Sequence, residues 1–445
     1  MNISWGSKVA AIVGVAAALL IALDRVSGIV AEREARLREA ENSVASSLAA
    51  QQHLIGPVLQ RQCEESWQTG VGEGKERKAV TERREFKILA TPKSLDLNGR
   101  VGLEPRRRGL YQVNGYVLKA TARAHWDALD DTLRPRAEHN PSTLRCQDPV
   151  VFVEVADVRG LRSVVLQTPS APLAVQPGTP RARSASGFQA AVPAIAWADG
   201  TLAIEIKLEV VGTRALSLAP VAEQTQVNLT SDWPHPSFQG RFLPNERDTS
   251  AQGFNASWRI SSLATSAPRD VRIDGQAVER FGVEFIDPVN AYLLADRATK
   301  YGVLFIGLTF LGVALTEVMR RARVHPMQYL LVGSALAIFF LLLVSLSEHM
   351  PFAWAYAAAS SVCTALLAFY GSHVLGGARG GVAFGSAVAA LYGVLYLLLQ
   401  QEQTSLALGS GLLFAALAAV MVLTRRLDWY RLFEAWRAAP AAASA

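Results

Sequence analysis

Six long apolar segments constrain what this chain can fold into. Five of them crowd the C-terminal third, at 299–319, 326–346, 352–371, 381–399 and 404–423. Each is near the ~20 residues that a helix needs to cross about 30 Å of hydrocarbon. A shorter segment at 8–23 carries no charge from Val9 to Leu23. Because unpaired backbone amides are not tolerated in lipid, the spans must be helices. The sequence therefore predicts an integral membrane protein with six spans and one large domain outside the membrane.

Charged residues concentrate between the first span and the other five. Half of the chain is apolar and the formal net charge is +6. No RNA- or DNA-binding motif accompanies that charge, so we expect no nucleic acid partner. The positive residues are better explained by membrane topology.

Arginines occupy alternate loops between the predicted spans. They lie in the 320–323 loop, at Arg379, and at Arg425 and Arg426, whereas the 347–351 and 400–404 loops hold no Lys or Arg. The positive-inside rule places the arginine loops in the cytoplasm. Both termini are then cytoplasmic and the large domain is periplasmic, or on the outer face of another cell type. We expect an uncleaved anchor rather than a signal peptide, because the first span runs directly into Asp24-Arg25 without a small-x-small cleavage site.

The predicted domain order follows from these segments. It consists of an anchor at 1–28, a periplasmic stalk helix at 29–60, a periplasmic β-rich domain at 61–297, a five-helix transmembrane bundle at 298–424, and a cytoplasmic interfacial tail at 425–445. The stalk shows i,i+4 ion pairs such as Glu32 with Arg36, and Gly56-Pro57 is expected to end it. In the tail, Trp429, Leu432, Phe433 and Trp436 share one helical face, which is typical of an interfacial helix.

Short runs with β-branched and aromatic residues at spacing two fill the large domain. They lie at 86–90, 109–125, 150–155, 162–166, 201–211, 226–229 and 256–260. Turn clusters such as Leu97-Asn98-Gly99 separate them. This pattern favours an antiparallel sandwich or barrel over a βαβ fold.

Three cysteines are present. Cys63 and Cys146 fall in the β-rich domain, where an oxidising compartment would preserve a disulfide. Sequence alone does not decide whether their Cα atoms come close enough to be bridged. Cys363 lies in the middle of a span and is expected to be a small packing residue.

An ordered series of motifs resembles one known family. The series includes Lys300–Ile306, His325–Gly333, Ser345–His349, Leu391–Tyr396 and Thr424–Tyr430, preceded in the β-rich domain by Phe238–Pro244 and Gly253–Trp258. Together they resemble CreD, the inner-membrane family named for cell-envelope integrity. Gln403 departs from the pattern, because an acidic neighbour to Glu402 is expected there. The resemblance implies a place in an envelope-stress response under a two-component system, associated with colicin tolerance and β-lactam response. It implies no catalytic activity, substrate or cofactor.

Few residues carry recognisable chemistry. Glu348 and His349, at the outer end of a span, are candidates for either a functional contact or a helix cap. His325 reads as the start of a helix before Pro326, and Glu317 is expected to pair locally with Arg320 and Arg321. In the β-rich domain, Phe242, Pro244, Phe254 and Trp258 are candidates for a contact surface, with a core strand and turn as the alternative. No metal-binding or catalytic set is recognisable.

These observations predict a non-enzymatic inner-membrane protein that maintains envelope integrity. Its periplasmic domain would contact an envelope component, a cell-wall partner or another protein, and the lipid bilayer surrounds its spans. The alternative is a transporter or lipid-handling protein with a path through the bundle, and a membrane-bound hydrolase is third. The sequence does not decide the oligomeric state.

Overall fold

The computed structural model describes residues 5–71, 78–109, 111–181, 186–273, 276–285, 291–320, 324–374, 377–401 and 405–425. The chain forms two compact units. A helical unit contains Met1–Leu37 and Val289–Ala445, and a β unit contains Arg38–Pro288. The expected cytoplasmic tail at 425–445, apart from Arg425, and the departure at Gln403 lie outside the described residues.

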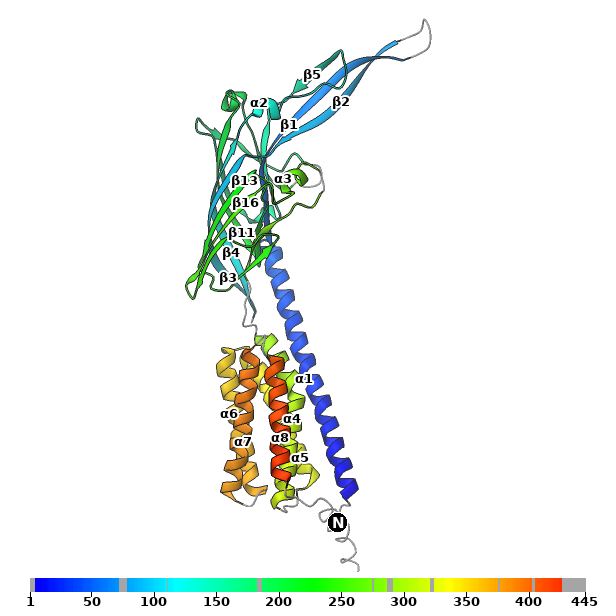
Figure 1. Ribbon diagram of the computed structural model, residues 1–445, viewed down its shortest axis with the longest axis vertical. Coiled ribbons are helices and arrows are strands. Elements are labelled where there is room, and N and C mark those ends of the chain that lie inside the picture. Colours follow the sequence, from blue (N-terminus) through cyan, green and yellow to red (C-terminus); the bar gives the residue numbers. More distant parts are fainter. Residues whose placement is uncertain are drawn as a thin grey trace, which may run out of the picture. The chain divides into compact units, whose positions relative to one another are not determined.

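Among the described residues, six helices are long and apolar enough to cross a membrane, which confirms the predicted spans. They are α1 (Trp5–Ser47), α4 (Ala291–Arg320), α5 (Pro326–Ser347), α6 (Phe352–Val374), α7 (Ala378–Gln400) and α8 (Ser405–Thr424) (Figure 1). Helix α4 begins eight residues before the apolar segment that predicted it, and α1 continues well beyond the first span.

The predicted end of the stalk helix is wrong. Helix α1 stops at Ser47, and Gly56-Pro57 lies inside strand β1 (Gln52–Val71). The pairing of β1 with β6 (Val150–Val155) shifts register between Ile55 and Val58. Because proline has no N–H to donate to a ladder, it is tolerated in a strand at such an irregularity. Gly56-Pro57 therefore marks a bulge in a strand rather than the end of a helix.

Close helix approach organises the helical unit. Leu19 and Leu23 of α1 pack where α5 and α4 have glycines, Gly333 and Gly302, and a Cβ on either glycine would meet a leucine methyl. The series of small residues at the start of α7 makes a similar contact with α6. A Cβ on Gly381 would lie 2.5 Å from the carbonyl oxygen of Ala368. Small residues of this kind let helix backbones approach closely in lipid.

Two sheets form the β unit. The first is nine-stranded, in the order β14-β17-β12-β1-β6-β10-β9, with β2 and β5 also paired to β1; the second is eight-stranded, in the order β15-β16-β13-β3-β4-β11-β7-β8. The remaining strands of the first sheet are β2 (Lys78–Ala90), β5 (Ser142–Cys146), β9 (Val175–Pro177), β10 (Gly187–Ala191), β12 (Ala215–Leu218), β14 (Pro236–Gly240) and β17 (Phe281–Phe285). The second sheet contains β3 (Ser94–Arg108), β4 (Tyr111–Trp126), β7 (Leu161–Gln167), β8 (Pro172–Leu173), β11 (Leu202–Thr213), β13 (Gln224–Ser231), β15 (Glu246–Ser250) and β16 (Gly253–Ser261). The short helices α2 (Leu129–Thr132) and α3 (Ala267–Asp270) lie in the connections.

The sequence predicts an antiparallel sandwich or barrel, but the β unit also contains parallel strand pairs. Strand β1 pairs with β12 in parallel, and β13 pairs with β3 in parallel. The chain changes sheet after β11, at Arg214, whose positive φ of 63° turns it directly into β12. The expected turn at Leu97-Asn98-Gly99 lies inside β3, where Gly99 leaves room for Leu229 and Leu118.

One apolar core contains residues from both sheets. Its largest fully buried side chains are Trp126, Trp258, Tyr116 and Phe281, while Phe152 belongs to a smaller apolar cluster with Ile55 and Val58. Strand β13 shows the alternation that builds such a core, since every second residue from Thr225 to Ser231 is buried. This period of two puts one face of the strand against the core and the other in water.

We predict that Gly381→Ala destabilises the helical unit. The added Cβ would meet Ala368 O and the Cα of Ser372, which are backbone atoms, so α6 and α7 would have to move apart. Overpacking of this kind costs about 1–3 kcal/mol, and we expect a lower Tm for the purified protein in detergent. Gly393→Ala in the same helix is the control, because its Cβ would meet nothing within 4 Å. Equal Tm values for the two variants would contradict the close approach of α6 and α7.

Candidate functional site

A polar cluster around Glu317 joins three helices of the helical unit. Lys8 of α1 forms an ion pair with Glu317 of α4, and the Tyr329 hydroxyl of α5 donates to the same carboxylate at 3.1 Å. The backbone N–H of Val324 lies 3.4 Å from it. Glu317 therefore has partners on two other helices, whereas the expected local pairs with Arg320 and Arg321 stay a prediction, because the Arg320 side chain and Arg321 lie outside what the structure describes. Sequence spacing shows only neighbours on one helix, and for that reason it missed Lys8 and Tyr329.

A second cluster surrounds Glu348, where α5 ends. Glu348 is the C-cap residue of α5. Its carboxylate lies 3.3 Å from the Arg33 guanidinium of α1 and 3.5 Å from the Tyr292 hydroxyl of α4. His349 Nδ1 lies 3.1 Å from the Ser345 carbonyl oxygen. Glu348 and His349 thus have helix-capping and helix-joining contacts.

The two clusters fix how α1 lies among its neighbours. Lys8 and Arg33 are 25 residues apart on α1, and Tyr292 and Glu317 are 25 residues apart on α4. At 1.5 Å per residue, each separation is about 38 Å. Helix α1 therefore runs antiparallel to α4. Because both clusters lie near helix ends, they can hold helices together but do not supply an ionisable group at mid-span.

His325 caps α5, as the sequence predicts. The His325 Nδ1 accepts a hydrogen bond from the backbone N–H of Met327 at 3.2 Å. The backbone N–H of His325 donates to the side-chain oxygen of Gln328 at 2.9 Å. This reciprocal capping box satisfies donors that the first helical turn leaves unpaired. The role of His325 is structural.

The interior of the helical unit is aromatic and tightly packed. Phe305, Phe339, Tyr356 and Tyr392 form a contiguous cluster. The Tyr356 hydroxyl donates to the Tyr392 carbonyl oxygen at 2.7 Å, while the buried Tyr392 hydroxyl has no hydrogen-bond partner among the described residues. Cys363 is buried beside them, and its thiol lies 3.7 Å from the Ala335 carbonyl oxygen.

A small cavity opens in the helical unit near one end of α5. It measures about 30 Å³, and its lining consists of Val313, Thr316, Val324, Gln328, Val332, Tyr370, Gly371, Val374 and Phe384. The exposed lining is entirely apolar. A cavity of this size has room for only a few water-sized molecules, and Glu348 and His349 do not line it.

The motif residues of the β unit divide into core and surface. Trp258 is 0% exposed and Phe254 is 4% exposed, so neither can anchor a contact surface. The Trp258 indole N–H donates to the Phe242 carbonyl oxygen at 3.2 Å, which ties β16 to the chain after β14. Phe242 and Pro244 are half-buried, and Leu243 between them is 64% exposed. Leu243 is the exposed apolar side chain of this turn, and it lies two residues after the exposed Arg241.

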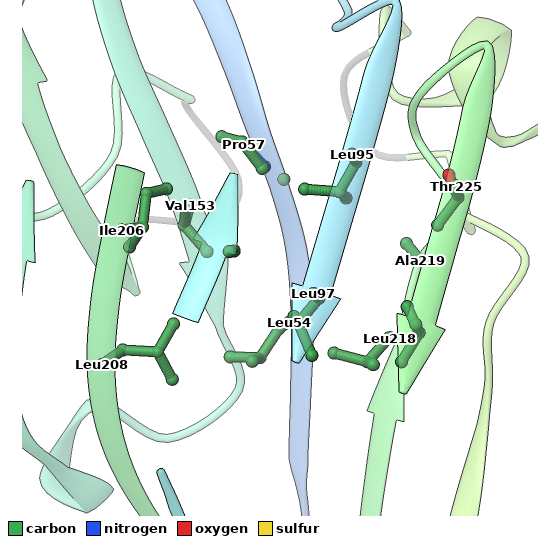
Figure 2. Close-up of a pocket in the computed structure, with 13 residues that line it drawn as sticks. Leu54, Pro57, Leu95, Leu97, Val153, Ile206, Leu208, Leu218, Ala219 and Thr225 are labelled. Carbon is green, nitrogen blue, oxygen red and sulfur yellow. The ribbon is translucent and has the colours of Figure 1, made fainter. Parts of the chain in front are cut away.

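A cavity of about 20 Å³ lies between the two sheets (Figure 2). Leu54 and Pro57 of β1 line it beside the register shift, together with aliphatic side chains such as Leu97, Val153 and Leu208. The Thr225 hydroxyl is its polar group and has no hydrogen-bond partner among the described residues. Because the cavity holds about one water-sized molecule, it is a packing gap beside the bulge rather than a cargo site.

Cys63 and Cys146 form a disulfide. The two residues lie directly opposite each other where β1 pairs with β5. Nearby, the fully buried carboxylate of Glu65 accepts from the backbone N–H groups of Glu138 and His139, both at 2.9 Å. Together these contacts fix the 134–141 segment against β1.

A polar junction satisfies the backbone where α1 gives way to β1. The Arg159 guanidinium donates to the Ser46 carbonyl oxygen at the end of α1. Asp157 accepts from the Ala50 N–H at 3.0 Å, and Thr213 donates to the Ala49 carbonyl oxygen at 3.0 Å. The hydrogen bond from Arg159 is the main reason that the pKa of Asp157 falls to about 2.

We predict that Asp157→Asn destabilises the protein in a pH-dependent way. The depressed pKa means that the carboxylate stabilises the fold above about pH 4, and that this contribution is lost as pH falls towards about 2. The expected loss at pH 7 is about 1–2 kcal/mol after allowance for solvent screening. The difference in Tm between wild type and variant should shrink as pH is lowered through this window. Asp148→Asn, at an exposed position, is the control, and a pH-independent difference for Asp157→Asn would contradict the assignment.

Comparisons with known proteins agree with this architecture. A model of a family described as inner membrane protein CreD matches residues 4–430. The chain is also 32% identical over 428 residues to the protein named Inner membrane protein CreD of Escherichia coli (strain K12), an alignment that covers 95% of this chain and 93% of that relative. Six apolar helices, a β unit of many strands and a match along nearly the whole length place this chain in the CreD family of inner membrane proteins.

Proposed function

We propose that this protein maintains cell-envelope integrity without catalysis, and that its β unit contacts an envelope component or protein partner in the periplasm. The observation that carries the location is the Cys63–Cys146 disulfide in the β unit, since disulfides persist in oxidising compartments. The alternating arginine loops support the same orientation, with both termini in the cytoplasm.

The helical unit supports anchoring rather than transport. Glu317 and Glu348 are engaged in pairs near helix ends. The cavity of about 30 Å³ is apolar and too small for cargo. Proton-coupled transporters place ionisable groups near the bilayer midplane, and the described parts of the spans offer none there.

Catalysis also lacks support in the described residues. Ser372 and His373 are sequence neighbours that share the Phe369 carbonyl oxygen as a partner, which is a helix contact rather than a nucleophile with an oriented base. No group of three or more His, Cys, Asp or Glu suited to a metal ion occurs in the described ranges. The partner proposal rests instead on the exposed Leu243 turn.

We predict that Leu243→Cys reacts with a membrane-impermeant maleimide crosslinker in intact spheroplasts and captures a partner. Leu243 is 64% exposed in the Phe238–Pro244 motif, so it is accessible if the β unit lies outside. Leu263→Cys, at a 97% exposed leucine outside that motif, should be labelled but should not give the same crosslink. Ser444→Cys should react only after lysis.

Two outcomes would contradict parts of this proposal separately. Equal labelling of Leu243→Cys and Ser444→Cys before lysis would overturn the orientation. Identical products from Leu243→Cys and Leu263→Cys would remove the Leu243 turn as a specific contact, while leaving the orientation intact.

We predict that Glu317→Gln lowers protein abundance but not activity per molecule. Losing the charge weakens the contacts with Lys8 and Tyr329, which are worth about 1–3 kcal/mol for bonds to an ionised group. The readout is complementation of an envelope-sensitive strain, normalised to membrane protein level. The exchange Lys8→Glu with Glu317→Lys should restore abundance by reversing the pair. Complete loss of complementation at normal abundance would overturn the anchoring role and favour transport through the helical unit.

A further inference from the structure

The β3–β4 hairpin extends past the strands that flank it. On one side, β13 pairs with β3 as far as Val101. On the other side, β11 pairs with β4 as far as Gly115. Strands β3 and β4 continue to pair with each other up to Arg108 opposite Tyr111. Residues 105–108 of β3 and 111–114 of β4 therefore form a two-stranded ribbon, about 13 Å long at 3.3 Å per residue.

The tip of this ribbon is strongly basic. Arg106, Arg107 and Arg108 are consecutive and exposed. Because side chains alternate along a strand, Arg107 lies on one face of the ribbon and the other two on the opposite face. Glu104 is the only acidic residue between residues 102 and 114, and it pairs with Arg106 at 2.8 Å and with Arg162 at 3.4 Å.

Arg107 and Arg108 do not contribute to packing or ion pairing among the described residues of the β unit. Within the described ranges, Arg107 and Arg108 make no ion pair, and the ribbon has no flanking strand that they could cover. An isolated two-stranded ribbon is marginally stable in water. Arg107 and Arg108 are therefore a basic surface that has no partner of opposite charge in the part of the chain that the structure describes.

The base of the ribbon coincides with the points where the chain enters and leaves the β unit. A Cβ on Gly115 would lie 3.3 Å from Leu48, directly after the end of α1. Arg214 lies 3.9 Å from Glu41 of α1 and 3.8 Å from Glu284 of β17. Strand β17 ends at Phe285, and five residues, 286–290, separate it from α4. Five residues reach at most about 20 Å, so the chain passes from β17 to a membrane-spanning helix through a short connection.

We propose that the Arg106–Arg108 tip binds anionic phospholipid headgroups of the bilayer that the chain itself spans. Guanidinium groups recognise phosphate oxygens in bidentate geometry, and basic residues close to a membrane are attracted to anionic lipids. Tyr111, next to the tip, is a residue type enriched at the membrane interface. This surface is separate from the Leu243 turn, and the proposal holds for either orientation of the β unit.

The test uses full-length protein in nanodiscs with an NBD fluorophore at Gln112→Cys, an exposed position opposite Arg107. The free thiol is removed by Cys363→Ala, and the disulfide is kept. Lipids carrying a spin label on the headgroup should quench the fluorophore strongly in mixtures of phosphatidylcholine with phosphatidylglycerol, and several-fold less in phosphatidylcholine alone or at high salt. The same fluorophore at Ser170→Cys, in the turn after β7, should be quenched little in either lipid.

Two triple variants separate charge from folding. Changing Arg106, Arg107 and Arg108 to Gln should abolish the extra quenching in anionic lipid, whereas changing all three to Lys should retain most of it. Helical and β content by circular dichroism verifies that both variants fold. Equal quenching in neutral and anionic lipid, or full quenching in the Gln variant, would overturn the proposal. Absence of quenching in every lipid would also overturn it and leave the tip to a protein partner.

Discussion

The backbone N–H and C=O groups between α1 and β1 need hydrogen-bond partners inside the β unit. Much of the architecture of this unit depends on the residues that provide them. A helix end leaves carbonyl groups without partners, and these lie where a sheet begins. Arg159 and Asp157 from one neighbouring segment and Thr213 from another supply the missing hydrogen bonds. The strand that emerges, β1, then pairs with β12, β2, β5 and β6. The hydrogen bonds to residues 46–50 therefore fix the C-terminal end of α1, which belongs to the β unit, beside the start of the central strand.

Hydropathy predicted the six spans because crossing the bilayer leaves a chain few alternatives. Local sequence signals predicted secondary structure less reliably where contacts between distant parts of the chain decide the conformation. Gly56-Pro57 resembles a helix terminator, yet here it accommodates a bulge in a paired strand. Parallel pairing of β12 with β1 depends on a change of sheet at Arg214 that no periodicity reveals. The start of α5 at His325 was predictable because capping is local chemistry.

The candidate site residues show the same division. Glu317 was recognised as a paired carboxylate, but its partner Lys8 is 309 residues away in the sequence. Trp258 was a candidate for a contact surface because it is a large aromatic residue in the Gly253–Trp258 motif. Its complete burial assigns it to the core. Leu243, an apolar residue of the Phe238–Pro244 motif that does face outward, is unremarkable in sequence. Exposure is a property of the fold, and a single sequence carries it only indirectly.

The uncharged lengths of the spans are unequal, and the surrounding lipid has to respond. On α1 the stretch without charge is Val9–Leu23, and on α4 it is Tyr301–Thr316, each about 22–24 Å long at 1.5 Å per residue. Helix α5 carries no charged side chain over its whole length, about 33 Å. A hydrocarbon layer about 30 Å thick is longer than the uncharged stretches of α1 and α4, whereas it matches the length of α5. Either the acyl chains beside α1 and α4 shorten, which makes the bilayer thinner there than beside α5, or the charged side chains at the ends of α1 and α4 reach outward to the headgroups.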